Sequence, residues 1–545
     1  MMHPTKIIRA LAVLAAAGAL SINARAQCII NMGSTSQTID GFGFSTAWCP
    51  GISSAQGALL FGTGSGQLGF TILRCRIDPN GSGNWGTEQG NASVAHSYGA
   101  KVMGTPWTPP ASMKNNNNVV CGDLLPSQYG AFASYLNQAA NSIGLDYVSM
   151  QNEPDFCPGN YESCNPTASE IETFCANNAP AIGRPVIVAE SDGFYDNMTD
   201  PTLNNSTAAS HITIVAGHFY GNGNYVHQNA LNHGKHVLET EINWTGANIG
   251  TAMTEAQSIS DAMNNQFSAF LWWWIMPNDA ASFLNGTTVD IRGYVLGQFA
   301  KYIRPGSTRV SSTYNPQSNV SVTAYKVNGN LVIVALNTAT GSVNQQFNIQ
   351  NGSVGSLEGY RTSSSQNMAD IGSFGVSGGS FTATLSAQSV TTFVQTSGGG
   401  GGIANGTYKL INLNSGLALD ATGAQTTNGT QLEQWTYHSG NNQQWTITSL
   451  GSSLYQIIGV QSGKSVDINA SGTTNGTKVQ LWTYGGGANQ KFYFNPTSGG
   501  YYEISPSHAT GSCLDVSGVS KSNGAIVWLW QWLSGANQQW SPQAP

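Results

Sequence analysis

Residues 148–155 read Val148-Ser149-Met150-Gln151-Asn152-Glu153-Pro154-Asp155, a short apolar stretch that runs into a carboxylate and a proline. Side chains alternate over residues 146–150 as in a strand, and Pro154 has no N–H with which to extend a strand ladder. Glu153 is therefore expected at the end of a strand. A carboxyl group held there can act as a general acid if a second carboxylate faces it, and otherwise it only caps a loop. The run 237–242, Val-Leu-Glu-Thr-Glu-Ile, supplies the candidates Glu239 and Glu241.

Strands and helices alternate on both sides of this stretch. Residues 36–44 predict a strand that runs into a glycine-containing loop, and apolar runs at 71–78, 100–105, 186–190, 212–216, 237–241 and 270–275 predict further strands. Residues 127–143, 167–179, 254–266 and 294–304 have helical spacing. Alternation over about 250 residues is typical of an α/β barrel. The pattern predicts a (β/α)8 TIM barrel over residues 27–305, with functional side chains at the carboxyl ends of its strands.

The pattern changes after Arg304-Pro305-Gly306. Alternating runs at 320–327, 331–336, 380–385 and 390–395, with Asn-Gly turns at 328–329 and 351–352, predict an all-β sandwich over residues 306–396. Residues 28–40 are expected to add strands to this side domain. The glycine-rich segment 397–405 predicts a flexible linker to a last domain, residues 406–545.

Residues 406–545 contain an internal repeat. An Asp recurs at intervals of 47 and 48 residues, and each Asp is followed by a Trp after fifteen residues and by an Asn after twenty-two. The three sets are Asp420, Trp435 and Asn442; Asp467, Trp482 and Asn489; and Asp515, Trp530 and Asn537. Three repeats of strand-and-turn composition predict a β-trefoil with pseudo-threefold symmetry.

The composition excludes several classes of partner. Charged residues make up 9% of the chain, the net charge is −7 and only 20 residues are Lys or Arg, so we expect no surface for nucleic acid or anionic lipid. The 14 Trp and abundant uncharged polar residues suit a neutral, hydroxyl-rich ligand.

The first 26 residues have the features of a signal peptide. Lys6 and Arg9 give a positive start, residues 7–20 are mostly apolar, and Ala24-Arg25-Ala26 is a small-x-small cleavage site. The apolar run is too short to span a membrane comfortably. We therefore expect a secreted, soluble protein, acting as a monomer.

The chain has eight Cys, seven of them from Cys28 to Cys175, which in an exported protein suggests disulfides. Cys157 and Cys164 flank a loop just after Glu153 and are candidates to close it. No set of Cys and His has the spacing of zinc ligands, so we expect no metal and no other cofactor. The five His from His211 to His236 are expected at the surface or along a substrate cleft.

Several motifs within residues 36–395 resemble glycoside hydrolase family 30, and most closely its subfamily 8 of bacterial endo-xylanases. The motifs are Gly41-Phe42-Gly43, Arg74-Cys75-Arg76-Ile77-Asp78-Pro79-Asn80, Pro106-Trp107-Thr108-Pro109-Pro110-Ala111-Ser112-Met113-Lys114, Gln151-Asn152-Glu153-Pro154-Asp155, Trp272-Trp273 and Arg292-Gly293-Tyr294. The resemblance implies an endo-β-1,4-xylanase that acts on xylan and related plant cell-wall polysaccharides. It also implies retention of configuration, with an acid/base on barrel strand 4 and a nucleophile on strand 7.

By this resemblance Glu153 is the acid/base, and the family's Thr-Glu pattern selects Glu241 as the nucleophile, with Glu239 as the alternative on the same strand face. Glu190, at a third strand end, is expected to support the pair. Asn152 is expected to hydrogen-bond the sugar 2-OH.

Aromatic residues at strand ends, or in the loops that follow them, are candidates to stack on sugar rings. They are Trp85, Trp107, Tyr220, Trp244 and Trp273. Trp107 and Trp273 match binding positions in the family, whereas core packing is an equally good interpretation for the others.

The C-terminal repeat resembles ricin-B-type lectins and the xylan-binding modules of carbohydrate-binding module family 13. The resemblance implies that the Asp and Asn of each lobe bind sugar hydroxyls and that the Trp stacks on the sugar ring. The Gln-x-Trp core motif is present at 443–445 and 538–540, whereas the middle repeat has Gln490-Lys491-Phe492. Trp532 stands where such lobes often have a partner for Cys513, so Cys513 is expected to be unpaired.

Many hydrolases of this subfamily grip a glucuronic acid side group with an Arg shortly after the paired Trp of strand 8 and a Tyr two residues beyond the nucleophile. Pro277 and Asn243 stand at those positions here, and Asp279 follows. Since no neutral residue replaces a bidentate Arg, we expect xylan hydrolysis that does not depend on glucuronate.

Two alternatives stay open from the sequence. One is a non-catalytic carbohydrate-binding protein with a vestigial barrel. The other is a family 30 glycosidase that acts on a glucan or on a glucosyl lipid.

Overall fold

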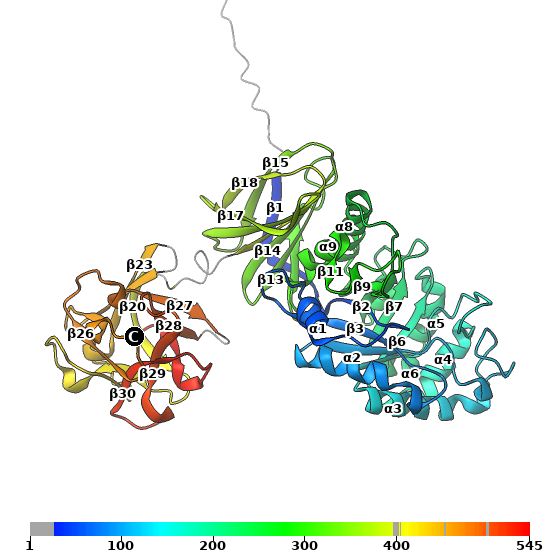
Figure 1. Ribbon diagram of the computed structural model, residues 1–545, viewed down its shortest axis with the longest axis horizontal. Coiled ribbons are helices and arrows are strands. Elements are labelled where there is room, and N and C mark those ends of the chain that lie inside the picture. The colour runs from blue at the N-terminus through cyan, green and yellow to red at the C-terminus, as the bar shows by residue number, and fades with distance from the viewer. Residues whose placement is uncertain (1–26, 396–402, 404, 452–453, 498–500) are drawn as a thin grey trace, which may run out of the picture.

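The computed structural model describes residues 27–395, 403, 405–451, 454–497 and 501–545. The predicted signal peptide and most of the predicted linker lie outside these ranges. The described residues form a closed eight-stranded barrel, a nine-stranded sheet and a separate β-trefoil, which confirms the predicted fold class (Figure 1). None of the helices in this part of the chain combines the length and the apolar composition needed to cross a bilayer.

The barrel strands are all parallel and each pairs with the next in chain order. They are β2 (Gly41–Ser45), β3 (Ile72–Arg76), β4 (Lys101–Thr105), β5 (Tyr147–Ser149), β6 (Val186–Ser191), β7 (Ile214–His218), β8 (His236–Ile242) and β9 (Ala269–Trp274). The helices of the outer ring are α1 (Ser54–Phe61), α2 (Gly86–Ser97), α3 (Tyr129–Ile143), α4 (Ala168–Asn177), α5 (Asp196–Asn204), α6 (Ser206–His211), α7 (Gln228–Asn232), α8 (Ile249–Asn264) and α9 (Ile291–Ala300). All strand C-termini meet at one mouth.

The strand that leads to Glu153 is shorter than the sequence predicts. β5 ends at Ser149, and the chain then bends so that the Glu153 N–H donates to the carbonyl of Glu190 at 2.9 Å. Glu153 has a φ of 42°, in the left-handed region. The strand therefore ends well before Pro154, and the bend, not the missing proline N–H, sets the position of Glu153.

The side domain is a sheet of nine strands that folds back on itself. Its order is β17 (Gln366–Gly375), β16 (Ser356–Ser363), β19 (Ser389–Gln395), β14 (Asn330–Asn337), β13 (Val320–Val327), β12 (Thr308–Ser312), β1 (Gln27–Thr38), β15 (Val343–Gln350) and β18 (Ser380–Leu385). Phe374 of β17 and Phe381 of β18 come from the two ends of this order and lie 6.2 Å apart, ring centroid to centroid. This contact closes the sandwich.

β1 joins the N-terminal end of the described chain to this sheet. It pairs in parallel with β15 and antiparallel with β12, and Figure 1 shows it as a blue strand among green ones. The sequence predicts a strand that runs into a glycine-containing loop over residues 36–44, whereas β1 ends at Thr38 and the glycines Gly41 and Gly43 belong to the next strand, β2. The chain changes from the sandwich to the barrel between these two strands.

β14 shows how the sandwich is fixed to the barrel. Val332, Val334 and Leu336 belong to the core that is continuous with the barrel, while Leu331 and Ile333 belong to the core inside the sandwich. Both faces of the strand are buried, so it reads as a continuous apolar run.

The trefoil consists of twelve strands, four for each repeat. They are β20 (Gly406–Asn412), β21 (Ala418–Ala421), β22 (Leu432–Trp435), β23 (Trp445–Gly451), β24 (Leu454–Gly459), β25 (Ser465–Ile468), β26 (Thr477–Trp482), β27 (Phe492–Pro496), β28 (Tyr502–Pro506), β29 (Ser512–Val516), β30 (Ala525–Gln531) and β31 (Gln539–Gln543). Trp445, Phe492 and Trp540 are fully buried at equivalent places in its core. Phe492 therefore fills the core of the lobe that departs from the Gln-x-Trp motif.

The position of β1 yields a stability test with a matched control. Ile30 is fully buried in the sandwich, whereas its neighbour Ile29 is 43% exposed. We expect Ile30→Ala to destabilise the protein by about 2–5 kcal/mol, because it leaves a cavity in a packed core. Ile29→Ala should cost about 0.5 kcal/mol or less. Chemical unfolding followed by Trp fluorescence measures both, and equal effects would contradict the placement of β1.

Candidate active site

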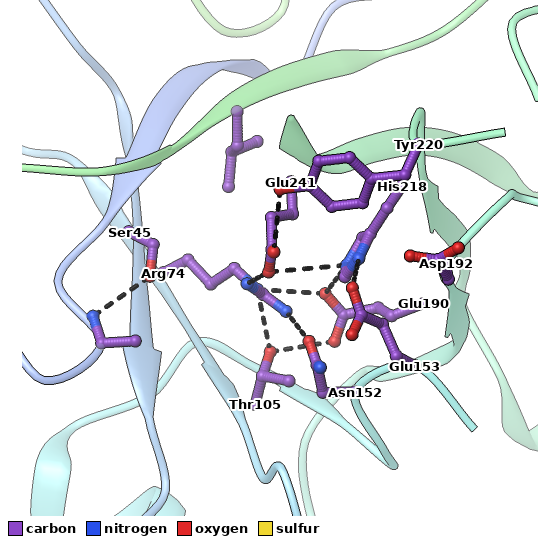
Figure 2. Close-up of polar contacts among 12 residues, drawn as sticks. Ser45, Arg74, Thr105, Asn152, Glu153, Glu190, Asp192, His218, Tyr220 and Glu241 are labelled. Atoms are coloured by element: carbon purple, nitrogen blue, oxygen red, sulfur yellow. Dashed lines mark hydrogen bonds and ion pairs between the residues drawn. The ribbon is translucent and has the colours of Figure 1, made fainter. Parts of the chain in front are cut away.

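A buried arginine lies at the centre of the barrel mouth (Figure 2). Arg74, the middle residue of β3, donates through Nη1 to Glu241 Oε2 at 2.6 Å and through Nε to Glu190 Oε1 at 3.1 Å. Its Nη2 donates to Asn152 Oδ1 at 2.6 Å. One guanidinium therefore fixes side chains from three other barrel strand ends, and it orients the amide of Asn152.

His218, the last residue of β7, is a second buried cation. Its Nδ1 lies 3.0 Å from Glu153 Oε1, and its Nε2 lies 3.9 Å from Glu190 and 4.0 Å from Glu241. Burial opposes the charged imidazole, but the charge of Glu241, the hydrogen bond with Glu153 and the nearby carboxylate of Glu190 outweigh it and raise the pKa of His218 to about 10. His218 is therefore positively charged at neutral pH.

Glu190 is the anion that these two cations stabilise most clearly. Burial alone would raise its pKa, but the charge of Arg74 and the contacts with His218 lower the pKa of Glu190 to about 2. Glu190 is fully buried, so its role is to hold Arg74 and His218 in place and not to contact a ligand.

Glu239 and Glu241 lie on the same strand but in different surroundings. Glu239 is fully buried and accepts the backbone N–H groups of Glu241 at 2.8 Å and Leu271 at 3.2 Å. Burial raises the pKa of Glu239 well above its ordinary value. Both of its oxygens are thus occupied by the barrel wall. The geometry favours Glu241 as the residue that faces a ligand.

Glu241 is held by donors only. Besides Arg74, the hydroxyl of Tyr220 donates to its Oε1 at 3.1 Å, and Asn243 Nδ2 donates to the Tyr220 hydroxyl at 3.0 Å. Burial raises the pKa of Glu241, while the charges of His218 and Arg74 act in the opposite direction. Since every described partner donates, the site is built for the carboxylate form.

Glu153 and Glu241 face each other across a cavity of about 530 Å³. One oxygen of Glu153, one oxygen of Glu241 and one ring nitrogen of His218 all lie within 4.8 Å of one another. The cavity is lined by Trp48, Trp107, Glu153, Phe156, Tyr161, Asp192, Tyr220, Glu241, Trp273 and Trp274. Seven of these ten side chains are aromatic and the other three are carboxylates, so flat apolar faces surround a few acidic groups.

Three of the predicted aromatic residues, Trp107, Tyr220 and Trp273, line this cavity. Trp107 is nearly buried and packs edge-on against Trp48 at 4.9 Å, under the guanidinium of Arg74 at 4.7 Å. The Trp107 ring is therefore held in place by the Trp48 ring and by the Arg74 guanidinium.

The prediction for Trp85 is wrong. Its ring is fully buried, its Nε1 donates to the carbonyl of Asp78 and it packs on Tyr135, so it belongs to the core. Trp244 packs on Trp272 and does not line the cavity either. Trp244 follows the end of β8 by two residues, whereas Trp85 lies nine residues after the end of β3, in the segment that leads into α2.

Sequence reasoning missed several residues of the site. They are Arg74, Trp48, Phe156, Tyr161, Asp192 and Trp274, whereas His218, expected at the surface or along a cleft, is a buried residue of the site. Trp48, Asp192 and Trp274 end a barrel strand or follow one within three residues, and His218 ends β7. Applying the strand-end criterion to every strand would have found these four. His227, by contrast, is buried against Phe194 and hydrogen-bonded to Asp196, so the expectation of a surface or cleft position is wrong for it.

The predicted link between Cys157 and Cys164 is also wrong, since Cys157 is bonded to Cys121 and Cys164 is a buried free thiol. The loop that carries Cys121 lies alongside the segment after Glu153. The Ser163 N–H donates to the carbonyl of Val119 at 3.0 Å, and the Cys121 N–H donates to Ser163 Oγ at 2.9 Å. This pairing brings the two bonded Cys together beside Phe156. Cys513 is free, as expected.

The loop after β9 contains no cation that faces the cavity. Asp279 Oδ1 accepts from Trp274 Nε1 at 3.3 Å and from the Ala281 N–H at 2.8 Å. Arg292 is 2% exposed, and its N–H groups go to Asp290 and to the carbonyls of Trp244, Ala280 and Ser282. Arg292 therefore has no donor left for a ligand.

Each trefoil lobe brings its predicted Asp and Asn together. Asn442 donates to Asp420 at 3.0 Å, Asn489 to Asp467 at 2.8 Å and Asn537 to Asp515 at 2.8 Å. The associated Trp435 and Trp482 are about two-fifths exposed, and Trp530 is half-buried. The middle lobe has a cavity of about 520 Å³ lined by Asp467, Trp482 and Asn489, among others.

Known proteins match this chain in two parts. Glucuronoxylanase XynC from Bacillus subtilis (strain 168) is 36% identical over 406 residues, which cover 70% of this chain and 95% of that protein. The crystal structure of the glycoside hydrolase family 30 subfamily 8 xylanase Xyn30A from Clostridium acetobutylicum shares 38% identity, with a TM-score of 0.65 over 68% of this chain and 99% of that one. A GH30 endoxylanase from Clostridium papyrosolvens C71 matches the same shares at 38% identity and a TM-score of 0.63.

The remaining part matches a family described as ricin-type beta-trefoil lectin domain-like, over residues 393–482 and 488–544. The hydrolase relatives are matched over nearly their whole length, and the trefoil follows that region in the chain. The chain is thus a glycoside hydrolase that belongs to family 30 and carries a ricin-type β-trefoil after its catalytic region.

Proposed function

We propose that the protein is a secreted endo-β-1,4-xylanase that hydrolyses xylan with retention of anomeric configuration. The observation that carries the proposal is the pair of carboxyl groups, Glu153 and Glu241, whose oxygens lie within 4.8 Å of each other over an aromatic cavity. Retaining glycosidases place these groups about 5 Å apart, whereas inverting ones leave roughly 6.5–9.5 Å for a water molecule. The relatives named as xylanases support xylan as the substrate.

In the first step, Glu241 attacks the anomeric carbon while Glu153 protonates the departing glycosidic oxygen. A covalent glycosyl–Glu241 ester forms and the C–O bond to the leaving sugar breaks. In the second step, the ionised Glu153 removes a proton from water, and the resulting nucleophile displaces Glu241 from the anomeric carbon.

The buried charges of the site match these roles. Arg74 and His218 contribute two positive charges, and ionised Glu190 and Glu241 contribute two negative charges. The general-acid role proposed for Glu153 requires it to carry a proton at the start of the cycle. Glu153 can accept from His218 through Oε1 and keep its proton on the other oxygen.

The walls of the cavity suit a neutral polysaccharide. Trp273 and Trp274 stack with ring centroids 4.8 Å apart, and Trp48 and Trp107 form a second pair beside them. Such faces pack on the C–H surfaces of sugar rings. No Lys or Arg is among the described residues that line the cavity, whereas Glu153, Asp192 and Glu241 are.

We further propose that this xylanase does not depend on a glucuronic acid side group. The position at which a uronate-binding Arg is expected is Pro277, and Asp279 beside it accepts from Trp274. Arg76, over the ring of Trp48, is engaged by Asp78 and Glu162. A uronate bound at the edge of the cavity near Trp48 and Trp274 would face carboxylates, and each arginine described there is already paired with a carboxylate. The name glucuronoxylanase of the relative XynC describes that protein only.

Secretion rests on the signal-like sequence of residues 1–26 and is consistent with the disulfide between Cys121 and Cys157. The trefoil is proposed to anchor the enzyme on xylan through shallow sugar sites. Weak sites on one rigid domain raise avidity on a polymer much more than affinity for a short oligosaccharide.

The assignment of the two carboxyl groups is tested by three variants. Glu153→Gln and Glu241→Gln should each lower kcat on xylan by at least about 10²-fold. Glu239→Gln is the control and should retain most activity, because Glu239 only accepts backbone N–H groups. Reducing-sugar release from linear xylan measures all three. Loss of activity in the Glu239 variant with normal turnover in the Glu241 variant would reverse the assignment.

Retention is tested by the configuration of the first product. ¹H NMR during hydrolysis should show the β-anomer before mutarotation, and an initial α-anomer would contradict retention. With an activated aryl xyloside, azide should partly rescue Glu241→Ala and give an α-glycosyl azide, because azide then attacks from the side of the missing carboxylate.

Independence from glucuronate is tested on one xylan before and after removal of its side groups. We expect kcat/KM to change less than about threefold, because no cation of the cavity contacts a uronate. Pro277→Arg should shift the preference toward glucuronoxylan, and Pro277→Ala should not. A collapse of activity on the unsubstituted chain would refute independence.

A further inference from the structure

The three lobes of the trefoil differ at the residue that faces the Asp across the strand pair. Glu433 faces Asp420, Gln480 faces Asp467 and Trp528 faces Asp515. This facing residue lies two positions before the repeat Trp of its lobe (Trp435, Trp482 or Trp530), so the two side chains share one face of the strand. The facing residue is therefore next to both groups that a sugar would contact.

In the second lobe, the facing residue hydrogen-bonds the Asp and leaves the Trp ring open. Gln480 Nε2 donates to Asp467 Oδ1 at 3.0 Å and to Asn469 Oδ1 at 3.1 Å. Trp482 is 43% exposed, and both side chains line the cavity of about 520 Å³. A sugar can enter between this ring and the carboxylate.

In the third lobe, the facing residue makes the two contacts that a sugar would make. Trp528 Nε1 donates to Asp515 Oδ1 at 2.7 Å, and the Trp528 ring stacks on Trp530 with centroids 5.0 Å apart and planes inclined by 24°. A bound sugar would donate a hydroxyl to the carboxylate and lay its ring on the indole. The indole of Trp528 therefore contacts both the Asp515 carboxylate and the Trp530 ring, the two groups that a sugar would contact.

We propose that Trp528 occupies the sugar position of the third lobe, so that the trefoil binds xylan through its first two lobes. This inference rests on the proposed binding of xylan by the trefoil, and it changes the sequence expectation of three equal sites. A sugar entering the third lobe would have to displace a neighbouring side chain at high effective concentration.

The first lobe lacks such an occupant. Glu433 is an acceptor when ionised, so it cannot donate to Asp420 as an indole N–H does. Trp435 is 41% exposed and has no stacking partner among the ring pairs of the described chain. Its face is open to a sugar.

The test uses the full-length chain with Glu241→Gln, so that xylan is bound without being cleaved. Depletion isotherms on insoluble xylan give an apparent Kd for each variant. Asp467→Ala and Trp482→Ala should weaken binding by about tenfold, as expected for one lost contact of a bivalent binder. Asp515→Ala and Trp530→Ala should change the Kd less than about twofold. Thermal unfolding confirms that each variant is folded.

Exchange of the facing residues tests the mechanism itself. Trp528→Gln gives the third lobe the residue of the second and should tighten binding at least about threefold by adding a site. Adding Asp515→Ala to this variant should abolish the gain. Gln480→Trp, the reverse exchange, should weaken binding as much as Asp467→Ala does.

Two results would overturn the proposal. Weakening by Asp515→Ala as large as that by Asp467→Ala, in folded protein, would show that the third lobe is a working site. Unchanged binding in Trp528→Gln would show that the indole does not block it. If the triple variant Asp420→Ala, Asp467→Ala, Asp515→Ala binds xylan as tightly as its parent, the anchoring function fails, and the lobe assignment with it.

Discussion

The buried guanidinium of Arg74 is the constraint on which the active site depends. It is fully enclosed, and it contacts Thr105, Asn152, Glu190 and Glu241 from four other strands or strand ends. An isolated buried cation is costly, so each of these partners is needed to compensate it. Conversely, without Arg74 two neighbouring carboxylates would face each other with only His218 between them. The closed barrel makes these contacts possible, because it brings Arg74 and Glu241, 167 positions apart in sequence, within hydrogen-bonding distance.

The two carboxyl groups reach this point in different ways. Glu241 lies within β8, where the strand ladder fixes its backbone, and Glu239 two residues earlier holds its N–H. Glu153 and Glu190 instead have φ values of 42° and 47°. Residues other than glycine rarely adopt this backbone conformation, and such strained residues are found mostly at functional sites. The Glu153 N–H donates to the Glu190 carbonyl, so the two strained residues hold each other in place.

The periodic parts of the molecule could be predicted from the sequence, since strand alternation, helical spacing and the Asp–Trp–Asn repeat are local signals. Glu153, Glu241, Trp107 and Trp273 followed from strand ends and family motifs, and all four line the cavity. Contacts between distant loops were not predictable. Cys121 pairs with Cys157 because Val119 and Ser163 form a hydrogen bond across two loops, which no spacing rule encodes. Trp85 was misplaced because it lies nine residues after the end of β3, and a strand end does not fix which way so distant a ring turns.

The barrel and the trefoil both combine carboxylates with indole rings, yet only one of the two arrangements is suited to catalysis. In the barrel, Glu153 and Glu241 share one cavity, and two buried cations control their charge. In the second trefoil lobe, the carboxylate of Asp467 accepts from the neutral amides of Gln480, Asn489 and Gln490. Amides orient a carboxylate without supplying charge, and Asp467 is the one carboxylate among the described residues that line that cavity. Such a site can hold a sugar by hydrogen bonds and stacking, but it has no acid to protonate a leaving group.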